Sequence, residues 1–289
     1  LAYVIIDEQH RFGVQQRLYL AEKGINTNIL LMSATPIPRT LALAQYGEIE
    51  QVILKEKPAF QKPIITKVSN IDKIKDIEIL LKKKISNVSQ VYWICPLVEA
   101  SETQKYKDVE TRFKSLKNIF GSEVEMLHGK IKSDQKERII QNFQKGNIKI
   151  LVATTVVEVG IDNKNADYIV IENAEKFGLS QLHQLRGRVG RGNNQGYCFA
   201  LYGKDLPDNT INRLKIFKEN LDGFKLSEKD LEIRGTGDIL GYRQSGDSLF
   251  KFVNVYHDQE LIIDALQYVK KLIEKKEYEN EKFKKNIYK

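Results

Sequence analysis

The sequence predicts an α/β fold in which a mostly parallel sheet is covered by helices. Short apolar runs of strand length recur along the 289 residues and alternate with charged stretches that have helical spacing. Hydrophobic residues make up 42% and charged residues 29% of the chain, which is typical of globular domains. The length suits about two domains. No apolar run approaches the ~20 residues that span a bilayer, so no membrane partner is expected.

The first region, residues 1–57, alternates strand and helix signals and ends at a linker. Pro58 and Pro63 bracket the linker, which covers residues 58–63. The elements expected before it are a strand over Leu1–Ile6, a helix around residues 14–22, a strand over Asn28–Met32 and a helix from Thr40.

The second region, residues 64–205, repeats strand and helix units, which predicts parallel pairing. A helix is expected over Ser133–Gln144, with Ser133 as its N-cap and Ile139, Ile140 and Phe143 on one apolar face. The expected strands are Val91–Val98, Val124–Leu127, Ile148–Ala153, Tyr168–Glu172 and Tyr197–Tyr202.

The third region, residues 206–289, changes in character. A helix over Asn209–Asn220 is followed by a glycine-rich segment from Gly235 to Gly246 and by a long amphipathic helix. The apolar face of that last helix consists of Ile262, Leu266, Val269 and Ile273.

Charge and cysteine content narrow the class of partner and the compartment. The formal net charge of +8 suits a polyanion such as nucleic acid, although a lysine-rich surface alone would give the same value. Cys95 and Cys198 lie far apart in apolar runs, so they are expected to be buried free thiols in a reducing cytosol.

Two adjacent carboxylates, Asp7 and Glu8, follow the first apolar strand, and His10 comes just after them. Nucleoside-triphosphate motors use such a pair to hold Mg²⁺ and to activate the attacking water. Asp7 would bind Mg²⁺ through water, Glu8 would be the base, and His10 would contact a neighbouring loop. Solvated carboxylates at a strand end are the alternative. No G-x-x-x-x-G-K-[ST] phosphate loop occurs in the chain, so half of an ATP site is expected to be missing.

Small hydroxyl residues follow the second strand. Ser33 and Thr35 are expected to be the partners of His10, although serine or threonine before proline is also common turn chemistry.

The most specific pattern is Gln184 to Gly192, in which Arg186, Arg188 and Arg191 alternate with glycines. Arginines resist burial and glycines weaken helices, so a packing role is not expected. Guanidinium groups bind phosphate oxygens in bidentate fashion, and Arg188 and Arg191 would share one face if the segment were helical. This predicts arginine fingers for the γ-phosphate of ATP, with a general anion-binding loop as the alternative.

A fourth pattern, Ala153 to Asp162, begins at the end of a strand, where ligands bind in α/β sheets. Thr154 and Thr155 could contact nucleic-acid phosphates, while Asp162 would face the nucleotide or an arginine.

Taken in chain order, from Asp7–His10 and Ser33–Thr35 to Thr154–Asp162 and Gln184–Arg191, the four patterns resemble motifs II, III, V and VI of superfamily 2 helicases. Longer segments are similar to the RecG family of bacterial branched-DNA helicases: DEQHRFGVQQR from Asp7, SATPIPRTLAL from Ser33, VYWICPLVEASE from Val91 and DLEIRGTGDILGYRQSG from Asp230.

The resemblance implies part of a first RecA-like domain, a complete second RecA-like domain and a C-terminal hairpin and loop that couple ATP use to translocation. It implies ATP and Mg²⁺ as cofactors, duplex and branched DNA and a single-strand-binding protein as partners, a monomeric state and a cytoplasmic, nucleoid-associated location. The implied roles are catalysis by Asp7, Glu8, Gln184, Arg188 and Arg191; nucleotide binding by Asp7, His10, Gly160, Asp162, Arg188 and Arg191; DNA binding by His128, Gly129, Thr154 and Thr155; and coupling by Ser33, Thr35, Arg234, Gly237, Arg243 and Gln244.

Two alternatives stay open. The transcription-repair coupling translocases of the Mfd family share the segment after the motor, but they tend to have D-E-E-Q where this chain has D-E-Q-H. An inert DNA-binding fragment is the other alternative, because a chain without a phosphate loop is not expected to hydrolyse ATP alone.

Overall fold

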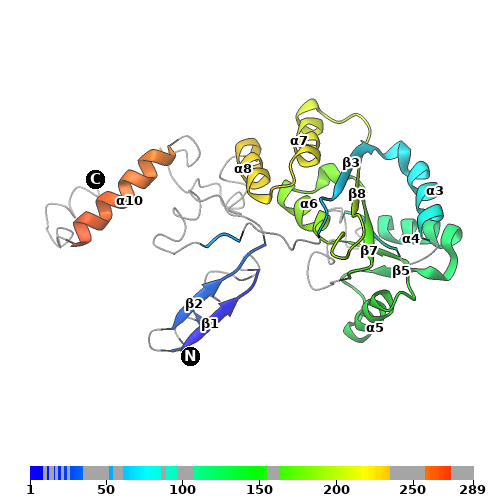
Figure 1. The fold of residues 1–289 in the computed structure, drawn as a ribbon, viewed down its shortest axis with the longest axis horizontal. Helices are drawn as coiled ribbons and strands as arrows, with labels where there is room; N and C mark the ends of the chain where they lie inside the picture. The colour runs from blue at the N-terminus through cyan, green and yellow to red at the C-terminus, as the bar shows by residue number, and fades with distance from the viewer. Residues whose placement is uncertain are drawn as a thin grey trace. The chain divides into compact units, whose positions relative to one another are not determined.

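The computed structural model describes part of the chain in two compact units, residues 1–35 with 56–226, and residues 36–55 with 227–289. The described residues are 1–8, 12, 16, 19–20, 23–24, 27–34, 52–54, 61–85, 89–96, 107–154, 163–234 and 258–274. Figure 1 shows the secondary structure of these parts.

The first unit contains a six-stranded sheet in which every pair of neighbouring strands is parallel. The strand order is β3-β8-β7-β4-β6-β5. The strands are β3 (Ile65–Asn70), β4 (Gln90–Ile94), β5 (Val124–Leu127), β6 (Ile150–Ala153), β7 (Ala166–Ile171) and β8 (Tyr197–Tyr202). The predicted α/β class with a parallel sheet is therefore confirmed.

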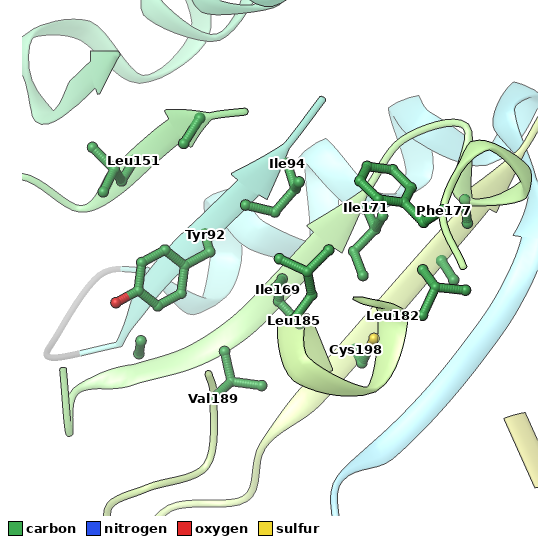
Figure 2. Close-up of a cluster of buried hydrophobic side chains, with 14 of the residues drawn as sticks. Tyr92, Ile94, Leu151, Ile169, Ile171, Phe177, Leu182, Leu185, Val189 and Cys198 are labelled. Atoms are coloured by element: carbon green, nitrogen blue, oxygen red, sulfur yellow. The ribbon is translucent and has the colours of Figure 1, made fainter. Parts of the chain in front are cut away.

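Helices cover both faces of this sheet. On one face α5 (Ser133–Gln144), α6 (Leu179–Arg186) and α7 (Asp208–Glu219) pack on side chains such as Tyr92, Ile94 and Ile171, part of the cluster drawn in Figure 2. On the other face α3 (Ile74–Lys84) and α4 (Lys107–Phe120) cover residues that include Val91 and Trp93. Because both faces are buried, the central strands are continuous apolar runs rather than alternating ones.

Two predictions about elements are corrected. Helix α5 covers the predicted residues, but its N-cap is Lys132 rather than Ser133, and no side chain makes a capping hydrogen bond. Strand β3 was not predicted, because its sequence ITKVSN alternates with polar residues. It is an edge strand that pairs only with β8, so it needs no continuous apolar run.

Both cysteine predictions hold, since Cys95 and Cys198 are buried free thiols. Burial raises the pKa of Cys198 to about 12, although the nearby Arg186 lowers it.

The first unit also contains a two-stranded parallel sheet made of β1 (Tyr3–Ile6) and β2 (Asn28–Leu31). Val4 and Ile6 point to its buried side, whereas Tyr3 and Ile5 are exposed. Both strands lie within the predicted ranges.

Helix α8 (Gly223–Arg234) continues into the second unit, whose other described helix is α10 (Gln259–Glu274). The predicted C-terminal helix is thus present. Val269, on the expected apolar face, is 47% exposed and Leu272 is 6% exposed. Within the described residues, no helix is both long and apolar enough to span a membrane.

Candidate functional site

The predicted site residues of the six-stranded sheet fall at two opposite edges. Because all strands run the same way, their ends form a carboxyl edge and their beginnings form an amino edge. Thr154 follows β6 and His128 follows β5, so both lie at the carboxyl edge. The segment after α6 lies at the amino edge, where Gly190 N–H donates to Ala166 O at 3.1 Å.

At the carboxyl edge, Thr154 is fully buried, and its N–H donates to Leu127 O at 3.4 Å. Among the described residues, its Oγ1 has no hydrogen-bond partner. A buried hydroxyl without a partner costs folding free energy.

The turn after β5 presents His128 and Gly129. Lys130 N–H donates to His128 Nδ1 at 3.3 Å, and Lys136 Nζ donates to Gly129 O at 3.1 Å. Burial lowers the pKa of His128; Lys130 and Lys136 lower it further, and Glu110 opposes them. The lowered pKa favours the neutral imidazole, whose Nδ1 accepts the hydrogen bond from Lys130.

A charged cluster at the same edge was not predicted. The Glu172 carboxylate, just after β7, accepts hydrogen bonds at 2.5 Å from both Trp93 Nε1 and Arg112 Nε. Arg112 also pairs with Glu78 at 3.3 Å. Burial raises the pKa of Glu78, Arg112 lowers it and Glu172 raises it. The sequence signal was a glutamate directly after the apolar strand β7, together with the single tryptophan of the chain.

The cluster ties helix α4 to the ends of β4 and β7. Its charges are shielded, since the side chains of Arg112 and Glu172 are 20% and 10% exposed. It therefore orders the carboxyl edge beside the candidate DNA-contacting residues.

At the amino edge, the structure corrects the expectation for Arg186. This arginine is 2% exposed, and it donates to Phe217 O at 2.9 Å and to Asn220 O at 2.8 Å. Its guanidinium also lies 4.5 Å from the centre of the Phe217 ring. Arg186 is thus a packing residue whose guanidinium group binds carbonyl groups at the end of α7. Burial of an arginine is unfavourable when its N–H groups lack hydrogen-bond partners, and here they have partners.

Arg188 and Arg191 are half-buried and lie beyond the end of α6, in what we call the arginine loop, residues 187–196. The sequence placed these two arginines on one face only if the segment were helical, and it is not helical. Arg191 Nε donates to Gly187 O at 2.9 Å. Gln184 is half-buried in the last turn of α6.

Glycines of this segment allow backbone segments to approach one another. Gly190 has φ +68°, and a Cβ on Gly196 would come within 2.9 Å of Gly190 Cα. A Cβ on Gly192 would lie 2.5 Å from Lys164 O. Only glycine fits these positions, so their first role is to shape the loop rather than to admit a ligand.

A pocket of about 270 Å³ lies beside the loop. Its lining includes Lys62, Pro63, His183, Arg186, Arg191 and Leu221.

Asp7, Glu8 and Ser33 share the carboxyl edge of the two-stranded sheet. The register pairs Ile6 with Leu31, and Met32 N–H donates to Ile6 O at 2.8 Å. Glu8 N–H donates to Asp7 Oδ1 at 2.8 Å, and Glu8 has φ 49°. A non-glycine residue in this left-handed conformation is strained, which is frequent at functional sites. Asp7 keeps a second oxygen for water of a hydrated cation, but no group of three metal-ligand side chains occurs within the described residues.

Several predicted site residues fall outside the described residues: His10, Thr35, Thr155, Gly160, Asp162, Gly237, Arg243 and Gln244. For Arg234 the structure gives only the backbone, at the end of α8.

Comparison with known proteins gives a consistent result. Residues 70–193 match the helicase conserved C-terminal domain. The ATP-dependent DNA helicase RecG of Borreliella burgdorferi is 48% identical over 267 residues, which cover 91% of this chain and 38% of that protein. RecG of Staphylococcus aureus is 44% identical over 273 residues, or 94% of this chain and 40% of that protein.

Among solved structures, RecG bound to a three-way DNA junction superposes with a TM-score of 0.70 and 38% identity, covering 91% of this chain and 33% of that one. Yeast Dbp5 bound to RNA, with 18% identity and a TM-score of 0.56, shares the fold. The chain spans about two fifths of the length of the curated relatives it matches. Over the part that it covers, the chain is similar to the RecG helicases.

Proposed function

We propose that the chain is the C-terminal motor portion of an ATP-dependent DNA helicase that remodels branched DNA, such as stalled forks and Holliday junctions, in recombination and repair. The observation that carries this proposal is the similarity to RecG through nine tenths of the chain, including a RecG solved on a three-way junction. The similarity continues beyond residues 70–193, the part matched by the general helicase domain.

The amino edge is proposed to serve the nucleotide. Arg188 and Arg191 would stabilise the charge that develops on the γ-phosphate, and Gln184 would help to orient it, because planar guanidinium groups match phosphate oxygens. Asp162 directly precedes Asn163 in sequence and Gly160 lies two residues before Asp162, and both would reach the same nucleotide.

The carboxyl edge is proposed to serve DNA. Thr154, Thr155, His128 and Gly129 offer hydroxyl, imidazole and backbone donors, which suit sugar-phosphate contacts without sequence preference. The net charge of +8 favours a polyanionic partner.

Asp7 and Glu8 would complete the catalytic set when ATP and Mg²⁺ are bound in the longer protein, meaning a protein of the length of the RecG relatives that contains residues 1–289, which span about two fifths of that length. Mg²⁺ would neutralise phosphate charge there. Asp7 would hold its water shell, and Glu8 would orient and deprotonate the attacking water. His10, Ser33 and Thr35 would relay the nucleotide state, and Arg234, Gly237, Arg243 and Gln244 would couple it to duplex movement.

The proposed domains are residues 1–57 from the first RecA-like domain, 58–63 as linker, 64–205 as the second RecA-like domain and 206–289 as the coupling segment. A monomeric state, a cytoplasmic and nucleoid-associated location and a single-strand-binding protein as partner are part of the same proposal.

The test compares ATP hydrolysis by residues 1–289 with hydrolysis by the longer protein, each with and without a three-way junction. We expect junction-stimulated hydrolysis only from the longer protein, because residues 1–289 contain no phosphate-loop sequence. ATP hydrolysis by residues 1–289 alone would contradict the proposal that this chain lacks part of the ATP site. A longer protein that is stimulated by RNA polymerase rather than by junctions would favour an Mfd-like function, and one that binds junctions without hydrolysis would favour an inert DNA-binding fragment.

A further inference from the structure

A buried carboxylate lies beneath the arginine loop and has no part in the proposed chemistry. Asp167, at the start of β7, is 3% exposed. Its Oδ2 accepts hydrogen bonds from Ser89 Oγ at 2.6 Å and from Asn194 Nδ2 at 3.1 Å. Among the described residues, Oδ1 is buried and has no hydrogen-bond partner. Such a group costs folding free energy, so packing alone does not account for it.

Asn194 belongs to the arginine loop, and its bond to Asp167 is one of several contacts that hold the far half of that loop. Gly190 N–H donates to Ala166 O, and Gly192 lies directly against Lys164 O. Gln195 Nε2 donates to Pro63 O at 2.6 Å. At the near end the loop starts from α6, which Arg186 fixes to α7. Arg188 and Arg191 therefore sit between two anchored ends.

The segment that receives these contacts is itself held firmly. Asn163 is 4% exposed, and its Nδ2 donates to Gln90 Oε1 at 3.0 Å. Gln90 Nε2 in turn donates to Phe143 O and Ile148 O, both at 2.5 Å. Residues 163–167 are thus joined to β4 and to the end of α5, and they form a rigid support for the loop.

We propose that Asp167 and Asn194 are positioning residues that set where the arginine loop places Arg188 and Arg191. The inference rests on the proposed arginine-finger function. A misplacement of about 1 Å in a catalytic group can cost on the order of 100-fold in rate, so a single hydrogen bond at the loop can matter far more for catalysis than for stability.

The test uses a reciprocal exchange in the longer protein. Asn194→Asp places two carboxylates face to face and repels the loop from its support. Adding Asp167→Asn restores the pair in reversed order, since the new Nδ2 in the place of Oδ2 can donate to the carboxylate of residue 194 and to Ser89 Oγ, which then accepts. Asn193→Asp is the matched control, because the substitution adds the same charge at the neighbouring position, which is exposed like Asn194.

We expect Asn194→Asp to lower kcat for ATP hydrolysis by about tenfold or more without a change in KM for ATP, and the double exchange to recover most of that loss. In a background of Arg188→Ala with Arg191→Ala, Asn194→Asp should have little further effect on kcat, because it acts through these two arginines. If the role of Asn194 were purely structural, Asn194→Asp would instead lower kcat by the same factor with and without the arginines. Equal kcat for Asn194→Asp and Asn193→Asp would overturn the inference.

Hydrogen exchange separates this outcome from a failure of the proposed function. In the 289-residue chain, Asn194→Asp should speed exchange at the Gly190 amide at least tenfold, and the double exchange should slow it again. If Arg188→Ala retains full ATP hydrolysis, the proposed arginine-finger function is wrong. The exchange rate of the Gly190 amide still shows whether the Asp167–Asn194 hydrogen bond holds the loop. If Asn194→Asp leaves the exchange rate of the Gly190 amide unchanged, the bond between Asp167 and Asn194 does not hold the loop, and the inference is overturned whatever the kinetic result.

Discussion

The two edges of the six-stranded sheet are built in different ways. The carboxyl edge is ordered by charged side chains, with Glu172 joining Arg112 and Trp93. The amino edge is ordered by close backbone approach at Gly190, Gly192 and Gly196 and by hydrogen bonds of the loop and of α6 to neighbouring segments. At the first edge His128 is half-buried and Gly129 is exposed, while Thr154 and Glu172 are buried; at the second edge one loop is fixed in one shape. A loop of fixed shape fits the proposed role of the second edge, which is to meet a phosphate at a defined point.

The strands between the edges set the distance over which the two proposed sites communicate. A six-residue strand such as β7 is about 20 Å long. No side chain bridges such a distance, so any coupling passes through elements that touch both edges. In sequence, residues 155–162 connect Thr154 at one edge to Asn163 at the other.

The variant expected to distinguish the functions of the two edges most clearly is Arg188→Ala. In the longer protein, Arg188→Ala should reduce ATP hydrolysis by about 10³-fold, because the guanidinium would stabilise charge only in the transition state. Affinity for a three-way junction, measured by fluorescence anisotropy, should change less than about twofold, since phosphate contacts at the other edge remain. Normal hydrolysis in this variant would refute the assignment of the amino edge to the nucleotide.

The next largest effect tests whether Arg186 is structural, unlike its neighbours in the motif. Arg186→Met should lower the free energy of unfolding by about 3 kcal/mol, because the carbonyls of Phe217 and Asn220 lose charged donors while buried. Urea denaturation of the 289-residue chain measures this. Lys218→Met, an exposed cation on the same helix α7, is the control and should change stability by less than about 0.5 kcal/mol.

At the carboxyl edge, Glu172→Gln should destabilise the chain by about 2 kcal/mol, since Arg112 would keep its charge without its main counter-ion. The fluorescence of Trp93, the single tryptophan, should shift in the folded state because its indole N–H is bonded to Glu172. The exposed Glu123→Gln variant serves for comparison. A Glu172→Gln variant as stable as that one would show that the cluster does not order this edge.

The smallest effect concerns Thr154. Thr154→Val should leave stability within about 0.5 kcal/mol, because it removes a buried hydroxyl that lacks a partner among the described residues. In the longer protein, affinity for the junction should fall by about tenfold if Oγ1 contacts a phosphate. DNA-independent ATP hydrolysis should not change. Unaltered affinity would remove Thr154 from the proposed DNA site.

The sequence predicted most of the fold because burial on both faces leaves a plain signal. The strands at Val124–Leu127 and Tyr197–Tyr202 were predicted to the residue, since the second is an unbroken apolar run and the first is apolar at every position except Glu125. Strand β3 was missed because an edge strand needs only one neighbour and tolerates polar residues.

The site was predicted by residue type but not by location. The arginine and threonine patterns both suggested phosphate contacts, yet the path of α6 back across the sheet carries the arginines to the edge opposite Thr154, which no local pattern encodes. Arg186 was misassigned for a related reason: its partners Phe217 and Asn220 lie on a later helix, so the sequence around it shows no sign of burial. Asp167 and Glu172 escaped notice because each is a lone acidic residue at the end of an apolar run.

The pairing of β3 with β8 also determines when this domain can finish folding. Strand β3 is the first of the six strands to be synthesised, and β8, its sole neighbour in the sheet, is the last. The remaining strands can assemble as they emerge from the ribosome, but the backbone groups of β3 wait for their partners until Tyr202 has been made. Contacts so distant in sequence slow folding, and an unpaired edge strand is prone to wrong pairing in the meantime. Rapid synthesis of the last strand would therefore shorten the period in which the nascent chain is most exposed to aggregation.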